Sequence, residues 1–116
     1  MKGSAAPSRG DIWLVDLSSA RGHEQAGTRP ALIISVDLFN HGPAGLVVAV
    51  PLTTKAKGIP LHVELRPPEG GVKEVSYVKC EDLRSISTER LLKRWGKVSP
   101  ATVFQVEDRL RILMGL

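Results

Sequence analysis

The sequence predicts a small, mainly antiparallel β barrel of five to seven short strands, with one helix at its C-terminal end. Two apolar runs rich in Val, Ile and Leu, at residues 31–36 and 46–52, are bounded by Pro and Gly and are too short for typical helices. Clear helical signals occur only from Ser99 onward. A chain of 116 residues suits one domain with a single modest core.

The first strand is expected at residues 11–17, because the segment DIWLVDL is rich in β-forming side chains. Residues 18–28 then form a polar loop that contains glycine. Pro30 restricts the preceding Arg29 to extended backbone conformations. This arginine is therefore held at the entrance of the next strand.

The two apolar runs, residues 31–36 and 46–52, are expected to pair as an antiparallel hairpin. The chain then folds about a midpoint near residue 41, which places Arg29 and Thr53 opposite each other at one end of the hairpin. A guanidinium fork beside a hydroxyl group is suited to hold a phosphate.

Further strands and loops are expected to alternate in the second half of the chain. Residues 62–66 alternate polar and apolar side chains, the pattern of a strand with one solvent-exposed face. The loop before this strand, residues 54–59, carries Lys55 and Lys57. The remaining expected elements are a turn at residues 67–71, strand pieces at 74–80 and 82–86, and a helical turn at 87–92.

The terminal helix has a well-defined start. Ser99 is a natural N-cap, and Pro100 suits the first helical position. Arg109 and Arg111 lie toward the end that favours cations. One apolar face is expected at helical spacing, formed by Val103, Val106, Leu110 and Leu113.

The charge balance favours a polyanionic partner. The chain has 16 Lys and Arg against 12 Asp and Glu, a net charge of +4. Cys80 is the one cysteine, so an intramolecular disulfide is excluded and a reducing cytoplasm fits. We interpret its thiol as a buried apolar side chain.

Residues 1–8 are expected to form a disordered tail, and residues 9–116 a single domain. The tail lacks the apolar core of a secretory signal. The sequence has no apolar run near the roughly 20 residues needed to cross a bilayer.

Four segments resemble the MazF/PemK-type toxins, the endoribonucleases of bacterial type II toxin–antitoxin pairs. They are RGDIWLVDL (9–17), GHEQAGTRPALIIS (22–35), VPLTTKAKG (50–58) and EDLRSI (81–86). The resemblance implies an SH3-like, CcdB/MazF-like barrel that forms a homodimer. It also implies sequence-specific cleavage of single-stranded RNA without metal or other cofactor, and neutralisation by a MazE-like antitoxin with a disordered acidic tail.

By the same resemblance, the essential arginine and threonine are Arg29 and Thr53, and Glu24 and Gln25 belong to the same motif. In metal-free cleavage the 2′-hydroxyl attacks the adjacent phosphorus, leaving a 2′,3′-cyclic phosphate and a 5′-hydroxyl. Charge builds on the non-bridging oxygens, where a fixed guanidinium stabilises it. Thr53 is expected to hold a phosphate oxygen or the attacking hydroxyl in line.

The general base is assigned to His23 or Glu24, because a guanidinium stays protonated in proteins. Many relatives have serine where this chain has His23, whose usual pKa suits proton transfer near neutrality. The alternative is that His23 only contacts RNA or solvent.

Asp82 replaces a glutamine found in many relatives at a position that contacts bases. An ionised carboxylate only accepts hydrogen bonds, so Asp82 would favour an amino donor such as that of cytosine. The alternative is a structural carboxylate that pairs with Arg84. The other expected RNA contacts are Gln25, Thr28, Lys55, Lys57 and Arg84.

A metal site is not expected, because His23, His41 and His62 are isolated in the sequence and Cys80 has no partner. Two other functions remain open. One is a CcdB-like toxin that inhibits DNA gyrase without catalysis, and the other is a barrel that binds RNA without cutting it.

Overall fold

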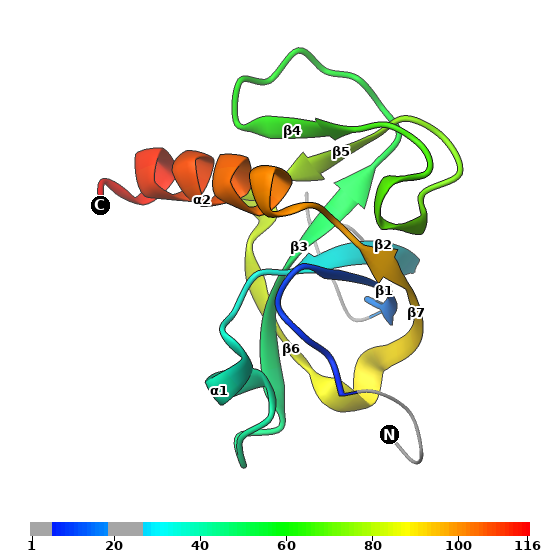
Figure 1. Ribbon diagram of the computed structural model, residues 1–116, viewed down its shortest axis with the longest axis vertical. Coiled ribbons are helices and arrows are strands. Elements are labelled where there is room, and N and C mark those ends of the chain that lie inside the picture. Colours follow the sequence, from blue (N-terminus) through cyan, green and yellow to red (C-terminus); the bar gives the residue numbers. More distant parts are fainter. Residues whose placement is uncertain (1–5, 19–26) are drawn as a thin grey trace.

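The computed structural model describes residues 6–18 and 27–116 (Figure 1). Within them, seven strands pair in antiparallel fashion: β1 (Asp11–Asp16), β2 (Thr28–Ile33), β3 (Leu46–Thr53), β4 (His62–Leu65), β5 (Ser76–Lys79), β6 (Arg84–Ser87) and β7 (Leu91–Lys97). The helices are α1 (Asp37–Asn40), α2 (Pro100–Met114) and the short 3₁₀ turns η1 (Glu69–Gly71), η2 (Cys80–Asp82) and η3 (Thr88–Arg90). The predicted mainly antiparallel β fold with a C-terminal helix is confirmed.

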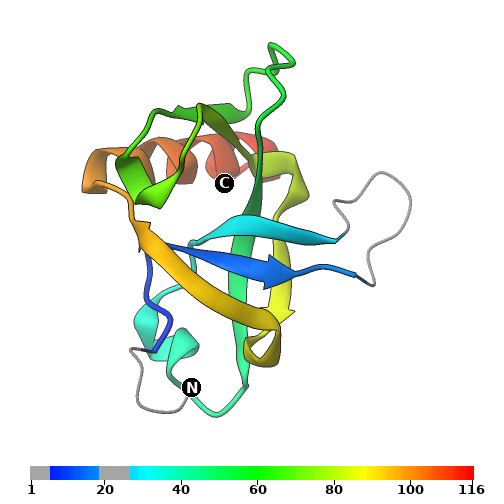
Figure 2. The same cartoon turned by 90° about the vertical axis from the view of Figure 1, so that its right-hand side faces the viewer.

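The strands follow the order β4-β5-β3-β2-β1-β7, and β6 also pairs with β3. In Figure 2 the ribbons of β1, β2 and β7 run across β3, so the sheet is strongly curved. β3 pairs with β2 along one edge. Its other edge pairs with β6 at its start and with β5 at its end.

One strand of the sheet, β7, was not expected from the sequence. β7 occupies residues predicted partly as a helical turn and otherwise left unassigned. Among the described strands it pairs with β1 alone, at the edge of the sheet, and Lys93 and Arg94 on it are exposed. Charged side chains are typical of edge strands, because they discourage pairing with other chains. They also hide the apolar alternation by which a strand is recognised.

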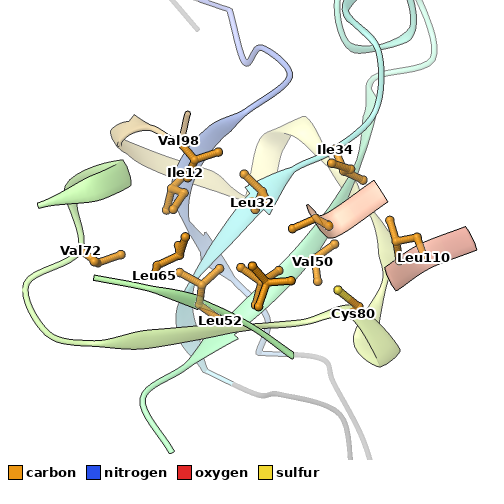
Figure 3. Packing of buried hydrophobic residues seen from close by; sticks show 13 residues of the cluster. Ile12, Leu32, Ile34, Val50, Leu52, Leu65, Val72, Cys80, Val98 and Leu110 are labelled. Atoms are coloured by element: carbon orange, nitrogen blue, oxygen red, sulfur yellow. The ribbon is translucent and has the colours of Figure 1, made fainter. Parts of the chain in front are cut away.

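Two clusters of buried side chains lie on opposite sides of the sheet. The larger cluster packs beneath α2 and includes Leu32, Val50 and Leu52 (Figure 3). The smaller one surrounds Trp13. Cys80 belongs to the larger cluster, and burial raises the pKa of its thiol to about 11, so its interpretation as an apolar core side chain is confirmed.

α2 begins as predicted, since the Ser99 side chain accepts a hydrogen bond from the amide of Thr102. Val106 and Leu110 are buried. The assignment of Leu113 to the same buried face is wrong: 41% of its surface is exposed, because the helix extends beyond the sheet at its C-terminal end.

Pro7 and Ser8, which the sequence assigns to the tail, lie against the domain. Pro7 is buried, and its carbonyl oxygen lies 2.8 Å from Nε2 of His41. Across the described ranges, we find no helix with the length and apolar character that a membrane span requires.

Candidate active site

The β2–β3 pair places Arg29 and Thr53 at the same end of one hairpin. Ala31 faces Pro51 and Leu32 faces Val50. Continuing this register by two residues sets Arg29 opposite Thr53, the arrangement that the predicted midpoint near residue 41 requires. Arg29 also faces Val15 on β1, so its strand is held from both sides.

Thr53 is the last residue of β3 and is half-buried. Its hydroxyl oxygen accepts a hydrogen bond of 3.2 Å from the backbone N–H of Lys55. This contact orients the oxygen and leaves the hydroxyl proton to be donated elsewhere. On the other side of β3, Thr53 faces Tyr77 of β5.

Arg29 and Thr53 line a cavity of about 200 Å³, which we call the basic cavity. Its lining residues are Arg29, Pro30, Leu52, Thr53, Thr54, Lys55, Lys57 and Lys79. Four of these side chains are cationic, two carry hydroxyl groups, and this lining contains no carboxylate among the described residues. Such a site attracts an anion of the size and hydrogen-bonding capacity of a phosphodiester.

The predicted placement of Lys55 and Lys57 beside Thr53 agrees with the structure, whereas Lys79 was not anticipated. Lys79 ends β5 and reaches the cavity because β5 pairs with the end of β3. Lys79 lies two residues after Tyr77 and so shares its strand face, which is the sequence signal that points to the cavity. That signal is usable only once the pairing of β5 with β3 is known.

Three predicted residues do not line the basic cavity. Thr28 lies at the exposed start of β2, opposite Asp16. Asp82 ends the turn η2 and Arg84 begins β6, and neither residue lines the cavity. His23, Glu24 and Gln25 lie outside the described residues.

The alternative in which Asp82 is a structural carboxylate paired with Arg84 gave the wrong partner, because Asp82 pairs with Lys79. Its Oδ2 lies 3.3 Å from Nζ of Lys79. Nε and Nη2 of Arg84 are buried without a hydrogen-bond partner within the described ranges. The carboxylate of Asp82 is thus connected to the basic cavity through Lys79.

No group of three or more His, Cys, Asp or Glu side chains suited to a metal ion occurs in residues 6–18 and 27–116. The described lining of the basic cavity carries the positive charges of Arg29 and three lysines.

The chain is similar to known proteins over nearly its whole length. Residues 8–114 match the family described as PemK-like, MazF-like toxin of type II toxin–antitoxin system. The endoribonuclease MazF9 of Mycobacterium tuberculosis is 38% identical over 113 residues, which cover 93% of this chain and 96% of that protein.

Solved structures agree. The crystal structure of MazF from Deinococcus radiodurans superposes with a TM-score of 0.84 at 30% identity, covering 97% of this chain and 100% of that one. An endoribonuclease from a mycobacterial species, solved in complex with its cognate antitoxin, gives 0.75 at 30% identity, covering 97% of both chains.

Proposed function

The chain belongs to the PemK-like, MazF-like toxins of type II toxin–antitoxin systems and is a toxin endoribonuclease, and on that premise we propose that it cuts single-stranded RNA in the basic cavity. The observation that carries this assignment is the juxtaposition of Arg29 and Thr53 among three lysines. Its fold is the CcdB/MazF-like barrel.

The proposed reaction is an internal transesterification. The 2′-oxygen attacks the adjacent phosphorus and loses its proton, while the 5′-oxygen leaves and gains one. The products are a 2′,3′-cyclic phosphate and a 5′-hydroxyl end. Negative charge accumulates on the non-bridging oxygens, and the guanidinium of Arg29 stabilises it without itself transferring a proton.

Thr53 is proposed to donate its hydroxyl proton to a phosphate oxygen. The Lys55 amide already occupies an acceptor site on the threonine oxygen, so the group enters the reaction with a fixed orientation. Fixed donors contribute more than mobile ones, because they need no reorganisation as the charge develops.

Proton removal from the 2′-hydroxyl is proposed to fall to His23 or Glu24, which both precede β2 in the sequence. The described lining of the basic cavity offers cations and hydroxyl groups but no carboxylate or imidazole. Gln25, the next residue in the sequence, is proposed to contact the RNA.

We also propose that cleavage needs no metal ion. Arg29 and the three lysines supply the positive charge that a metal would otherwise bring to the phosphate. An antitoxin with an acidic disordered tail suits the same surface, because its carboxylates compete with RNA phosphates for these cations.

The first experiment incubates the purified, antitoxin-free protein with a mixed RNA pool in EDTA and maps every new end. We expect cuts at one short sequence with 5′-hydroxyl ends, and loss of these cuts in Arg29→Ala. The same preparation is assayed for inhibition of DNA gyrase. Gyrase arrest with intact RNA would establish the CcdB-like function, and RNA binding without cuts would establish a non-catalytic barrel.

A further inference from the structure

The basic cavity contains one cation that differs from the others. Arg29, Lys55 and Lys57 are exposed, and both lysines lie on the loop that follows β3. Lys79 is buried, with only 11% of its side-chain surface exposed. A long flexible side chain in such a position is held in place, whereas an exposed one samples many conformations.

The fold places Lys79 through the register of β5. Thr53 faces Tyr77, and Leu52 faces the buried Val78. Because side chains alternate along a strand, Tyr77 and Lys79 share the face on which Thr53 lies. Lys79 therefore approaches the cavity from the edge of β3 that lies opposite β2 and Arg29.

The turn η2 brings a carboxylate to this lysine. Between Ala49 and Leu52 the β3 strand advances three residues, whereas its partner segment advances six, from Val78 to Arg84. The extra residues form the 3₁₀ turn Cys80–Asp82. This turn sets Asp82 three positions after Lys79, with Oδ2 at 3.3 Å from Nζ and the carboxylate side chain only 16% exposed.

We propose that Lys79 binds a backbone phosphate of the RNA at the cleavage site, and that Asp82 positions Lys79 instead of reading a base. This inference rests on the proposed function. The contact with Asp82 is an ion pair, and Oδ2 of Asp82 has no hydrogen-bond partner within the described residues. The ammonium group of Lys79 can therefore keep this ion pair and donate a hydrogen bond to a phosphate oxygen. In a partly desolvated cavity its attraction for a phosphate is stronger than that of a fully hydrated lysine.

The first test compares Lys79→Met, Lys79→Arg and, as a matched control, Lys73→Met. Lys73 is exposed and does not line the basic cavity. With a short single-stranded RNA that carries the mapped cleavage site, we expect Lys79→Met to lower kcat/KM by about 10- to 100-fold. We expect Lys79→Arg to restore most of the loss and Lys73→Met to cut at the wild-type rate.

A binding measurement separates phosphate contact from a merely structural salt bridge. A 2′-deoxy nucleotide at the cleavage site removes the attacking hydroxyl, so the dissociation constant of the intact RNA can be measured. The slope of log Kd against log salt should fall by about 0.7 in Lys79→Met, the change expected for one lost phosphate contact to a single strand. It should not change in Lys73→Met.

Asp82 is tested by a double-mutant cycle. Asp82→Asn should lower kcat with little change in KM, and it should cut at the wild-type sequence. The double variant Lys79→Met/Asp82→Asn should be no slower than Lys79→Met alone, because a residue that acts only through Lys79 has no effect in its absence. The double variant also avoids leaving the carboxylate buried without a partner, which could unfold Lys79→Met.

Three results would overturn the inference. The first is a folded double variant that keeps the wild-type cleavage rate and salt slope. The second is an effect of Asp82→Asn that persists when Lys79 is absent. The third is a changed cleavage sequence in Asp82→Asn, which would show that Asp82 reads a base. A wild-type protein that leaves RNA intact would instead refute the proposed function, and the inference with it.

Discussion

Arg29 and Thr53 lie on adjacent antiparallel strands, at positions that face each other in the extended register of β2 and β3. One wall of the basic cavity is thus built from a guanidinium and a hydroxyl group that are held by backbone pairing. Their separation is set by the sheet, not by the conformation of a loop.

This arrangement predicts that charge alone cannot replace Arg29. Arg29→Lys keeps the positive charge but loses the planar fork that binds two phosphate oxygens at once. We expect kcat to fall by about 100-fold, since removal of a fixed oxyanion donor typically costs 100- to 1000-fold. Single-turnover cleavage in EDTA measures the effect, and a fall of less than threefold would contradict it.

The hydroxyl of Thr53 is predicted to matter more than its methyl group. Thr53→Val preserves the β-branched shape but removes the donor, and should slow cleavage by about 100-fold. Thr53→Ser keeps the donor and the contact with the Lys55 amide, and should remain within a few-fold of the wild type. Equal rates for the two variants would exclude the hydroxyl from the reaction.

The placement of Arg29 and Thr53 could be predicted from local sequence, whereas the placement of Lys79 and Asp82 could not. Two neighbouring apolar runs with a short link form a hairpin, so the facing of Arg29 and Thr53 could be predicted from residue numbers. Lys79 enters the cavity through a pairing of β5 with β3 that skips β4. Sequence alone does not specify such a non-local register. Asp82 lies beside Lys79 because the turn η2 directly follows β5, whereas the partner expected from the sequence was Arg84.

A prediction about stability concerns Glu69, whose carboxylate stabilises the start of α2. Its Oε2 accepts hydrogen bonds from the Thr102 hydroxyl at 2.5 Å and from the Ser99 amide at 3.0 Å. Burial acts to raise the pKa of Glu69, but these hydrogen bonds outweigh it, and the net pKa lies below its usual value of 4.5.

A carboxylate with a lowered pKa stabilises the fold above the pKa of the unfolded chain. This stabilisation begins to decline when the pH falls below 4.5, the pKa of the unfolded state. It is lost as the pH falls further, through the lower pKa of the folded state. We expect Glu69→Gln to lower the free energy of unfolding by about 1 kcal/mol at pH 7. The difference from wild type should shrink below pH 4.5. Urea unfolding at pH 7 and pH 3.5 measures it, with the exposed Glu74→Gln as control.

The homodimer expected from the resemblance is predicted to use the exposed apolar side chains of α1 and the end of α2. Leu38 is 90% exposed and Leu116 is 83% exposed. Both elements project from the same side of the sheet in Figure 1. Exposed apolar side chains that gather on one side of a protein commonly mark an interface.

Leu38→Glu should therefore shift the protein from dimer to monomer at micromolar concentration, because it places a charge in the apolar contact. Leu92→Glu is the matched control, since Leu92 is also an exposed leucine, at 54%, but lies on β7. Light scattering coupled to size exclusion measures both masses. A Leu38→Glu dimer would place the contact elsewhere, and a wild-type monomer would contradict the homodimer itself.

The final prediction concerns proton transfer by His23 or Glu24. If His23 removes the 2′-hydroxyl proton, it must be neutral, and kcat/KM should fall as the pH drops below about 6.5. His23→Ser should then cut slowly and lose this limb of the pH profile, whereas Glu24→Gln should keep it. An unchanged rate and profile in His23→Ser would leave Glu24 as the base. In that case Glu24→Gln should abolish cleavage while the 2′-deoxy RNA still binds, because an amide cannot accept the proton but retains the shape of the side chain.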